Sequence, residues 1–328
     1  MGRTVLITGA NRGIGLEAAV QFAQLTGTDG ISTYDKVIIT ARDKRKGEAA
    51  IADASKRSGR PTSVFACVEL DLVSHASVWK AVESLPSSLD TVVLNAGGLM
   101  GESLTKHDVT ESFGANVLGH SILVEGLIKA GKIASEGARV VFSHSETTRS
   151  VWPFAGMQPF VRLYKNEMAG SLIAPPKRGV FGIAVRQRMN TYANSKLIGG
   201  LYFSALAREQ PQIYFVSISP GGCGETDVYA DAPQPMAFLM SLTIVKWIAS
   251  RLGVVHSASA AAARYVRAAT DAGFPSKFQS GAVVGGPYFR IADASGELRN
   301  QADFSTYYDD RELQDEALRI VRDAAARG

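Results

Sequence analysis

The sequence predicts an α/β protein with one doubly wound parallel sheet and helices on both of its faces. Short runs rich in Val and Ile alternate with longer amphipathic stretches along the chain. Most of these runs are apolar at successive positions, which is typical of strands buried on both faces of a parallel sheet. The first run also leads directly into a glycine-rich turn. Strand–helix alternation over the whole length predicts a single domain, 1–328.

The expected elements follow one another in regular order. Strands are expected in the apolar runs, at 4–8, 36–40, 63–70, 91–95, 139–143, 213–219 and 281–286. Helices are expected in the amphipathic stretches between them, at about 14–25, 43–57, 75–84, 108–131, 190–209 and 257–271. Two connections, 148–189 and 221–256, are much longer than the others. Connections of this length in a compact domain usually form lids or binding elements.

Composition excludes several classes of protein. Lys and Arg outnumber Asp and Glu by 35 to 31, and the net charge of +4 is too small and too dispersed to predict a nucleic-acid partner. The longest apolar run, 236–249, contains a lysine and is too short to span a bilayer, and no segment resembles a signal peptide. Two cysteines fit a reducing compartment, and Cys67 is expected to be buried as a small apolar residue. We therefore expect a soluble, cytoplasmic protein.

The glycine-rich turn TGANRGIG, 8–15, predicts a dinucleotide site. Gly9, Gly13 and Gly15 follow a strand and open a helix. Glycines at these places allow a tight turn, close approach of the backbone to a pyrophosphate, and close packing of helix on strand. The alternative is a turn with a structural role only.

Two arginines decide which dinucleotide is expected. An NAD site usually has a carboxylate after the second strand, where it binds the ribose hydroxyls. Here Ala41 occupies that place, Arg42 follows it, and Arg12 lies in the glycine turn. Guanidinium groups bind a 2′-phosphate with paired hydrogen bonds, so we predict NADP(H). The alternative is that Arg42 only caps a surface loop.

The segment TYANSK, 191–196, places Tyr192 and Lys196 four positions apart, on one face of a helix. A free phenol has a pKa near ~10 and exchanges protons slowly at neutral pH. A nearby cation favours the phenolate and lowers that pKa, so the phenol can serve as a general acid or base. A lone Tyr-x-x-x-Lys pair is common in helices, and the wider pattern decides its meaning.

These features together resemble the short-chain dehydrogenase/reductase family, over nearly the whole chain except the two long connections. The resemblance implies a Rossmann-type fold, and the segments LDLVSHASV, ANVLGH, YANSK and GGPYF most resemble its retinol dehydrogenase and protochlorophyllide reductase members. Asp71 is expected to face the adenine amino group, and Thr226 stands for the family's threonine, shifted by extra glycines. The expected cofactor residues are Gly9, Asn11, Arg12, Gly13, Ile14, Gly15, Arg42, Asp71, Leu72, Asn95, Ala96, Gly97, Tyr192, Lys196, Pro220, Gly221 and Thr226.

The same resemblance implies the catalytic residues Asn116, Ser145, Tyr192 and Lys196. Tyr192 would protonate the carbonyl oxygen as hydride arrives, and Lys196 would lower the pKa of the phenol and hold the nicotinamide ribose. Ser145 would hydrogen-bond the substrate oxygen. Asn116 would hold a water that links Lys196 to solvent.

The histidines are expected to have structural roles. His144 takes the place of the first of the family's two serines and should point away from the site; the alternative is contact with substrate. The other four, for which surface or helix-end positions and no metal are expected, are His75, His107, His120 and His256.

The two long connections indicate the kind of substrate. The connection 148–189 is rich in aromatic residues and prolines and resembles insertions in monomeric carbonyl reductases and protochlorophyllide reductases. It is expected to border the active-site mouth and to favour a monomer, although a dimer is possible; the alternative is a remote packing appendage. The connection 221–256 is expected to form an apolar, methionine-rich lid; the alternative is a helix on a membrane surface.

The function expected from these observations is NADP(H)-dependent reduction of a bulky apolar carbonyl, or oxidation of the corresponding alcohol. One alternative is a light-dependent photoenzyme similar to protochlorophyllide reductase. The other is a non-catalytic NADP-sensing protein.

Overall fold

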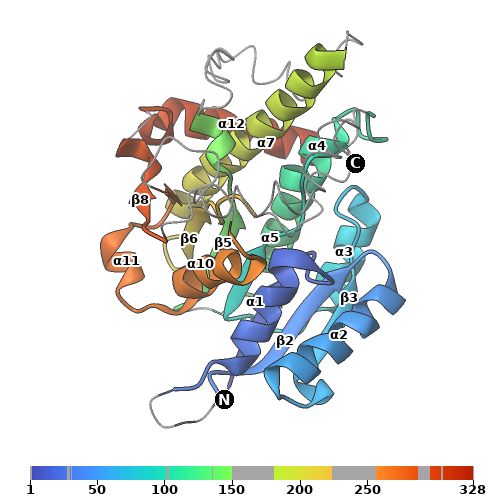
Figure 1. Ribbon diagram of the computed structural model, residues 1–328. Helices are drawn as coiled ribbons and strands as arrows, with labels where there is room; N and C mark the ends of the chain where they lie inside the picture. The colour runs from blue at the N-terminus through green and yellow to red at the C-terminus, as the bar shows by residue number, and fades with distance from the viewer. Residues whose placement is uncertain are drawn as a thin grey trace.

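An eight-stranded sheet forms the centre of the computed structural model (Figure 1), in the strand order β3-β2-β1-β4-β5-β6-β7-β8. The first seven strands are parallel, and β8 pairs with β7 in the antiparallel direction. This arrangement confirms the predicted α/β class. The structure describes residues 2–27, 30, 32–100, 103–134, 136–149, 181–223, 256–286, 296–303 and 306–327, with 181–190 described by their backbone only.

The seven predicted strands all form. Their bounds, with those of β8, are β1 Arg3–Ile7, β2 Tyr34–Ala41, β3 Phe65–Glu69, β4 Thr91–Leu94, β5 Arg139–Ser143, β6 Tyr214–Ile218, β7 Ala282–Gly285 and β8 Arg299–Asn300. The helices are α1 Gly13–Gln24, α2 Lys44–Ser58, α3 His75–Ser84, α4 Glu111–Phe113, α5 Gly119–Lys129, α7 Phe181–Glu209, α10 Ala258–Thr270, α11 Phe274–Lys277 and α12 Arg311–Ala325. Short turns of other helix types are η1 Thr62–Val64, the π-helical η2 Gly114–Leu118, η3 Glu146–Arg149, η5 Gln301–Asp303 and η6 Thr306–Asp309.

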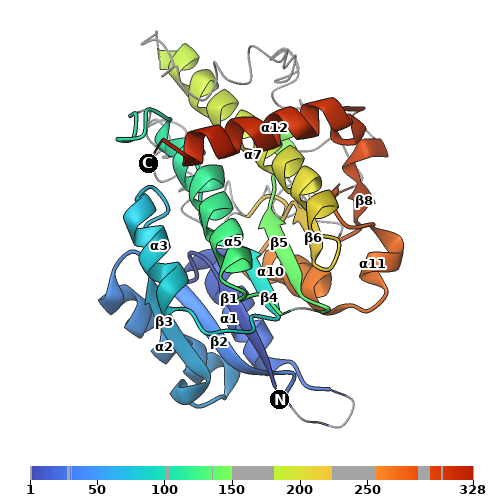
Figure 2. The ribbon, with the colours of Figure 1, turned by 180° about the vertical axis from the view of Figure 1, so that it is seen from behind.

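The sheet separates two apolar clusters because successive strand residues point to opposite faces. In β1, Leu6 belongs to an apolar cluster with residues of α3, α5, α7 and α12, whereas Val5 and Ile7 belong to a second cluster with residues of α1, α2 and α10. All three side chains are fully buried. Burial on both faces explains why the strand sequences are apolar without interruption. Figures 1 and 2 show the two helical layers from opposite sides.

Four features differ from the predictions. The amphipathic helix α12 and the short elements α11 and β8 were not predicted, and α7 begins at Phe181, not near residue 190. The helix predicted over 108–131 is interrupted by the π-helical turn η2. Cys67 is only partly buried, because it lies on the edge strand β3, so the prediction of a buried residue was wrong.

Most of the two long connections, 150–180 and 224–255, lies outside the described residues, and so do the wall and the lid predicted there. Among the helices that the structure does describe, none has the length and apolar character needed to cross a membrane.

Candidate active site

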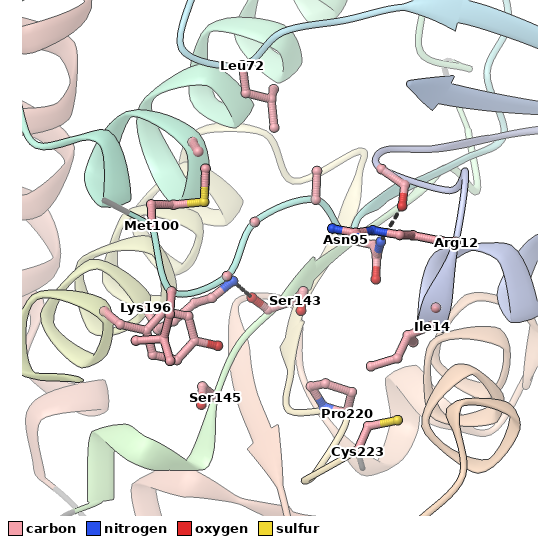
Figure 3. A pocket seen from close by; sticks show the side chains of 18 of the residues that line it. Arg12, Ile14, Leu72, Asn95, Met100, Ser143, Ser145, Lys196, Pro220 and Cys223 are labelled. Atoms are coloured by element: carbon pink, nitrogen blue, oxygen red, sulfur yellow. Dashed lines mark hydrogen bonds between the residues drawn. The ribbon is translucent and has the colours of Figure 1, made fainter. Parts of the chain in front are cut away.

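A cavity of about 480 Å³ lies at the carboxyl ends of β1, β4, β5 and β6. The strand order reverses direction between β1 and β4. In open α/β sheets, ligands bind at this switch point, outside the carboxyl ends of the strands. Figure 3 shows that side chains from well-separated parts of the chain converge here, including Arg12, Asn95, Ser145 and Lys196.

The glycine turn supplies one wall of the cavity. Gly9 and Gly13 have φ of +63° and +57°, which favours glycine. At Gly15 a Cβ atom would lie 2.7 Å from the Gly9 carbonyl oxygen and 2.6 Å from Asn95 Nδ2, so helix and turn pack too closely for a side chain. The N-cap residue of α1, Arg12, makes no side-chain cap, and no acid lies in the first turn. The first amides of α1 are therefore suited to an anion such as a pyrophosphate.

The segment after β4 holds this turn in place. Asn95 Nδ2 donates hydrogen bonds to the carbonyl oxygens of Thr8 (2.9 Å) and Gly9 (3.3 Å). The Ala96 amide donates to Thr8 Oγ1 at 3.0 Å. The expected cofactor residues Asn95, Ala96 and Gly97 all line the cavity. The residues present therefore fit a dinucleotide along this edge of the sheet.

The far end of the cavity carries the residues expected around the adenosine. Arg42 is exposed at the end of β2, and both it and Arg12 line the cavity. Asp71 also lines it, and its Oδ1 accepts a hydrogen bond from the Val73 amide at 3.1 Å. The remaining acidic residue of the lining, Glu111, begins α4, so no carboxylate of this lining comes from the end of β2.

Tyr192 and Lys196 lie one turn apart on α7 and both face the cavity. Lys196 is 2% exposed, and its Nζ donates to the Ser143 carbonyl oxygen at 2.7 Å, as Figure 3 shows. The same Nζ lies 5.7 Å from the centre of the Tyr192 ring. Burial disfavours the ammonium and lowers the pKa of Lys196 to about 7.

Ser145 lies beside this pair, in the turn that follows β5. Its Oγ accepts hydrogen bonds from the amide of Thr147 (3.3 Å) and from the Thr147 hydroxyl (2.9 Å). Among the described residues no acceptor takes the Ser145 hydroxyl hydrogen, which can donate to a substrate oxygen in the same cavity.

Asn116 is placed differently from the expectation. It is fully buried in η2 and does not line the cavity. Its Nδ2 donates to the carbonyl oxygens of Gly98 (2.9 Å) and Ser112 (2.7 Å), and its Oδ1 accepts from the Gly98 amide at 3.0 Å. Both amide hydrogens are therefore used inside the protein, and the side chain holds the cavity-lining residue Gly98.

The histidine predictions have mixed outcomes. His144 is one of the residues that line the cavity, and its ring packs against Tyr308, with centroids 5.6 Å apart. His120 is fully buried, and His107 is also buried, stacked on His75 at 3.5 Å. The predicted surface or helix-end position is correct for His120, which lies in the first turn of α5, and wrong for His107, which is buried in a turn. Within the described residues, no group of side chains is suited to a metal ion.

The cavity lining includes residues that the sequence analysis did not assign to the site, among them Tyr265, Cys223 and Met100. Tyr265 lies on α10, and its hydroxyl is 2.7 Å from Ser143 Oγ. Its partner is 122 positions away, so no local pattern identifies the pair. Cys223 and Met100 also line the cavity. Pro220 and Gly221 lie there as expected, and Thr226 lies outside the described residues.

Comparison with known proteins identifies relatives of this chain. The model of the short chain dehydrogenase family matches residues 3–159. A short-chain dehydrogenase/reductase from Armillaria gallica is 34% identical over 276 residues, covering 77% of this chain and 83% of that protein. The short chain dehydrogenase FGM9 of Gibberella zeae is 27% identical over 312 residues, covering 92% and 83%. Human retinol dehydrogenase 8 is 36% identical over 144 residues, 43% of this chain and 44% of that protein.

Solved structures share the fold. A crystal structure of an uncharacterized protein from Mycobacterium paratuberculosis has a TM-score of 0.66 at 22% identity, covering 99% of this chain and 93% of that one. L-sorbose reductase from Gluconobacter frateurii, complexed with NADPH and L-sorbose, has a TM-score of 0.58 at 17% identity, covering 90% and 97%.

The fold and these relatives define an oxidoreductase with a Rossmann-type fold. The chain belongs to the short-chain dehydrogenase/reductase family.

Proposed function

We propose that this protein is an NADP(H)-dependent oxidoreductase that transfers a hydride between the nicotinamide and a carbonyl or alcohol group of a bulky apolar substrate. The observation that carries the proposal is the convergence of the glycine turn, Ser145, Tyr192 and Lys196 on one cavity. A sensing protein without activity would have no need for the last three. We place the enzyme in the cytoplasm, as a single-domain monomer.

The choice of NADP(H) rests on charge at the adenosine end. Arg12 and Arg42 line it, and Ala41 stands where an NAD enzyme would have a carboxylate. Two guanidinium groups favour a 2′-phosphate, whereas a carboxylate would repel it. The fold neighbour L-sorbose reductase was solved with NADPH.

The cofactor, when bound, supplies the hydride. The chain's own residues manage the proton and the charge. Tyr192 donates its phenolic proton to the substrate oxygen in reduction and accepts it in oxidation. The Lys196 ammonium favours the phenolate and so lowers the pKa of Tyr192 toward neutral pH. Ser145 donates a hydrogen bond to the substrate oxygen and stabilises the negative charge that develops on it.

Asn116 acts from behind the cavity wall in this proposal. By holding both the amide and the carbonyl of Gly98, it fixes the segment beside the nicotinamide position. The proposed cofactor contacts also include Thr226, in the part of the chain that follows Gly221.

A bulky apolar substrate is supported by Leu99, Met100 and Cys223 in the described lining, and by the retinol dehydrogenase relative. Apolar and sulfur-bearing side chains favour apolar ligands, and methionine adapts to irregular shapes.

The cofactor choice is tested by titrating the protein with NADPH and NADH while its fluorescence is recorded. NADPH should bind at least about tenfold more tightly, because hydrogen bonds to charged groups contribute about 1.5–3 kcal/mol. Arg42→Ala should weaken NADPH binding and leave NADH binding unchanged. Equal affinity for the two cofactors in the wild type would refute NADP(H) as the cofactor.

A further inference from the structure

His120 does not line the cavity. It links three segments beside the cavity: the glycine turn, the turn around Asn116 and, through Thr8, the segment after β4. It is fully buried in the first turn of α5. Its Nε2 lies 2.9 Å from Thr8 Oγ1, at the start of the glycine turn. Its Nδ1 lies 3.3 Å from the main-chain carbonyl oxygen of Asn116. Thr8 in turn accepts a hydrogen bond from the Ala96 amide, in the segment after β4.

These contacts determine which ring nitrogen carries the proton. The Asn116 carbonyl is only an acceptor, so Nδ1 must donate to it. With the proton on Nδ1, a neutral ring leaves Nε2 as an acceptor for the Thr8 hydroxyl. Thr8 Oγ1 keeps a lone pair for the Ala96 amide, and the more distant Val93 carbonyl, at 3.5 Å, is the weaker alternative for its hydrogen. One neutral tautomer therefore satisfies both nitrogens.

The ring also remains uncharged at working pH. Burial, together with the nearby charge of Lys196, lowers the pKa of His120 to about 3. A positively charged His120 ring would be repelled by the Lys196 ammonium. The neutral ring, which still donates from one nitrogen, is therefore the favoured form.

The Asn116 carbonyl lies in a turn of irregular helix geometry. In η2 the Gly119 amide bonds to the Gly114 carbonyl, five residues back, as in a π-helix. π-helical turns disturb the regular series of hydrogen bonds and are frequent at functional sites. The side chain of Asn116 is fixed to Gly98, so a shift of its backbone would move the cavity wall.

We propose that His120 is a positioning residue of the catalytic site: its Nδ1–H holds the Asn116 carbonyl, and its Nε2 ties this carbonyl through Thr8 to the cofactor turn. The proposal rests on the oxidoreductase function proposed above. Its consequence is that the glycine turn and the segment that holds Gly98 keep one relative position.

Three substitutions separate the two contacts of the ring. His120→Asn keeps a nitrogen donor near the Nδ1 position. His120→Gln keeps a polar group near Nε2, and His120→Leu removes both. The assay is NADPH-dependent reduction of 4-nitrobenzaldehyde, with kcat, KM and Tm measured for each protein. His120→Leu and His120→Gln should lose about tenfold in kcat, equivalent to 1.36 kcal/mol in the barrier. His120→Asn should stay within about threefold of the wild type, because the donor to Asn116 remains.

A structural role alone would lower Tm and leave kcat of the folded protein unchanged. Wild-type kcat in His120→Leu, or an equal loss in His120→Asn, would overturn the proposal.

The tautomer is tested independently of activity. Long-range ¹H–¹⁵N NMR spectra of protein labelled with ¹⁵N-histidine assign the proton, and the signal missing in His120→Asn identifies the ring. We expect a neutral ring protonated at Nδ1, with no titration between pH 5 and 8. A proton on Nε2, or a titration in that range, would overturn the proposal. If the wild type reduces no carbonyl compound, the proposed function fails, and this spectrum still decides the role of His120.

Discussion

Lys196 is a charged residue that is almost completely buried. Burial of its ammonium lowers the stability of the folded protein, and this effect can be measured. Its ammonium has one described hydrogen-bond acceptor, the Ser143 carbonyl, at 2.7 Å. Burial lowers the pKa of Lys196 from 10.5 to about 7. Unfolded chain therefore binds this proton up to about pH 10.5, whereas the folded protein without cofactor releases it above about pH 7.

Stability should consequently rise with pH between 7 and 10.5, because the unfolded state binds more protons there. Lys196→Met removes this group and keeps its apolar length. Without cofactor, we expect Lys196→Met to have a higher Tm than the wild type at pH 7. The difference between the two Tm values should be smaller at pH 9. A gap that is constant with pH would mean that Lys196 titrates alike in the folded and unfolded chain.

At the scale of elements, the junction of the glycine turn and α1 makes a sharp prediction. In Gly15→Ala the new Cβ would lie 2.7 Å from the Gly9 carbonyl oxygen, so the turn must move. Overpacking of this kind costs about 1–3 kcal/mol. We expect about tenfold weaker NADPH binding with the fold retained, measured by fluorescence titration and circular dichroism.

Gly59→Asn is the matched control for this substitution. Gly59 ends α2 with φ of +73°, and a Cβ there would meet no atom within 4 Å. Asparagine tolerates this conformation, so NADPH affinity should not change. Equal losses in the two variants would show that the effect at Gly15 is not specific to the cofactor turn.

The elements that could be predicted from sequence are those with a local signal. The bounds of α3, His75–Ser84, agree with the prediction because Ser74 caps its start and apolar residues mark its buried face. The π-helical turn around Asn116 has no local signal, since its geometry depends on contacts with Gly98 and His120.

The residues of the candidate site also divide into those with a local sequence signal and those without one. The glycine turn and the pair Tyr192 and Lys196 are short patterns, and their order along the chain with the other motifs identifies them. Tyr265 and His120 reach the site only through tertiary packing, over 122 and 112 positions from their hydrogen-bond partners Ser143 and Thr8. The catalytic and cofactor roles themselves stay predictions.

At the scale of the whole molecule, α12 covers the layer formed by α5 and α7, as Figure 2 shows. Its buried apolar residues are Leu313, Ala317, Leu318, Ile320, Val321 and Ala324. Arg322 adds ion pairs to Glu125 on α5 and Glu209 on α7. A helix in this position shields apolar surface that would otherwise be available to a second subunit.

We therefore expect the full chain to be a monomer by light scattering after size-exclusion chromatography. Val321 is fully buried, and Val321→Asp would place a carboxylate among apolar side chains. Such a change should destabilise the protein by more than about 2 kcal/mol and release α12, so the variant should self-associate.

The control is Arg319→Gln, because Arg319 is exposed on the same helix and its ion pairs contribute little. A stable oligomer of the unaltered chain would contradict the shielding role of α12.

The proposed mechanism depends most on Tyr192 as the proton donor, and one comparison tests this directly. Tyr192→Phe keeps the ring and removes the acidic proton. The measurement is NADPH oxidation at 340 nm with a set of apolar aldehydes, ketones and quinones, for the wild type and the variant, together with the NADPH Kd of each. We expect turnover by the wild type in the dark, and a loss of about 10²–10⁴-fold in kcat with an unchanged Kd in the variant. Turnover retained by Tyr192→Phe with any carbonyl that the wild type reduces would contradict the central claim.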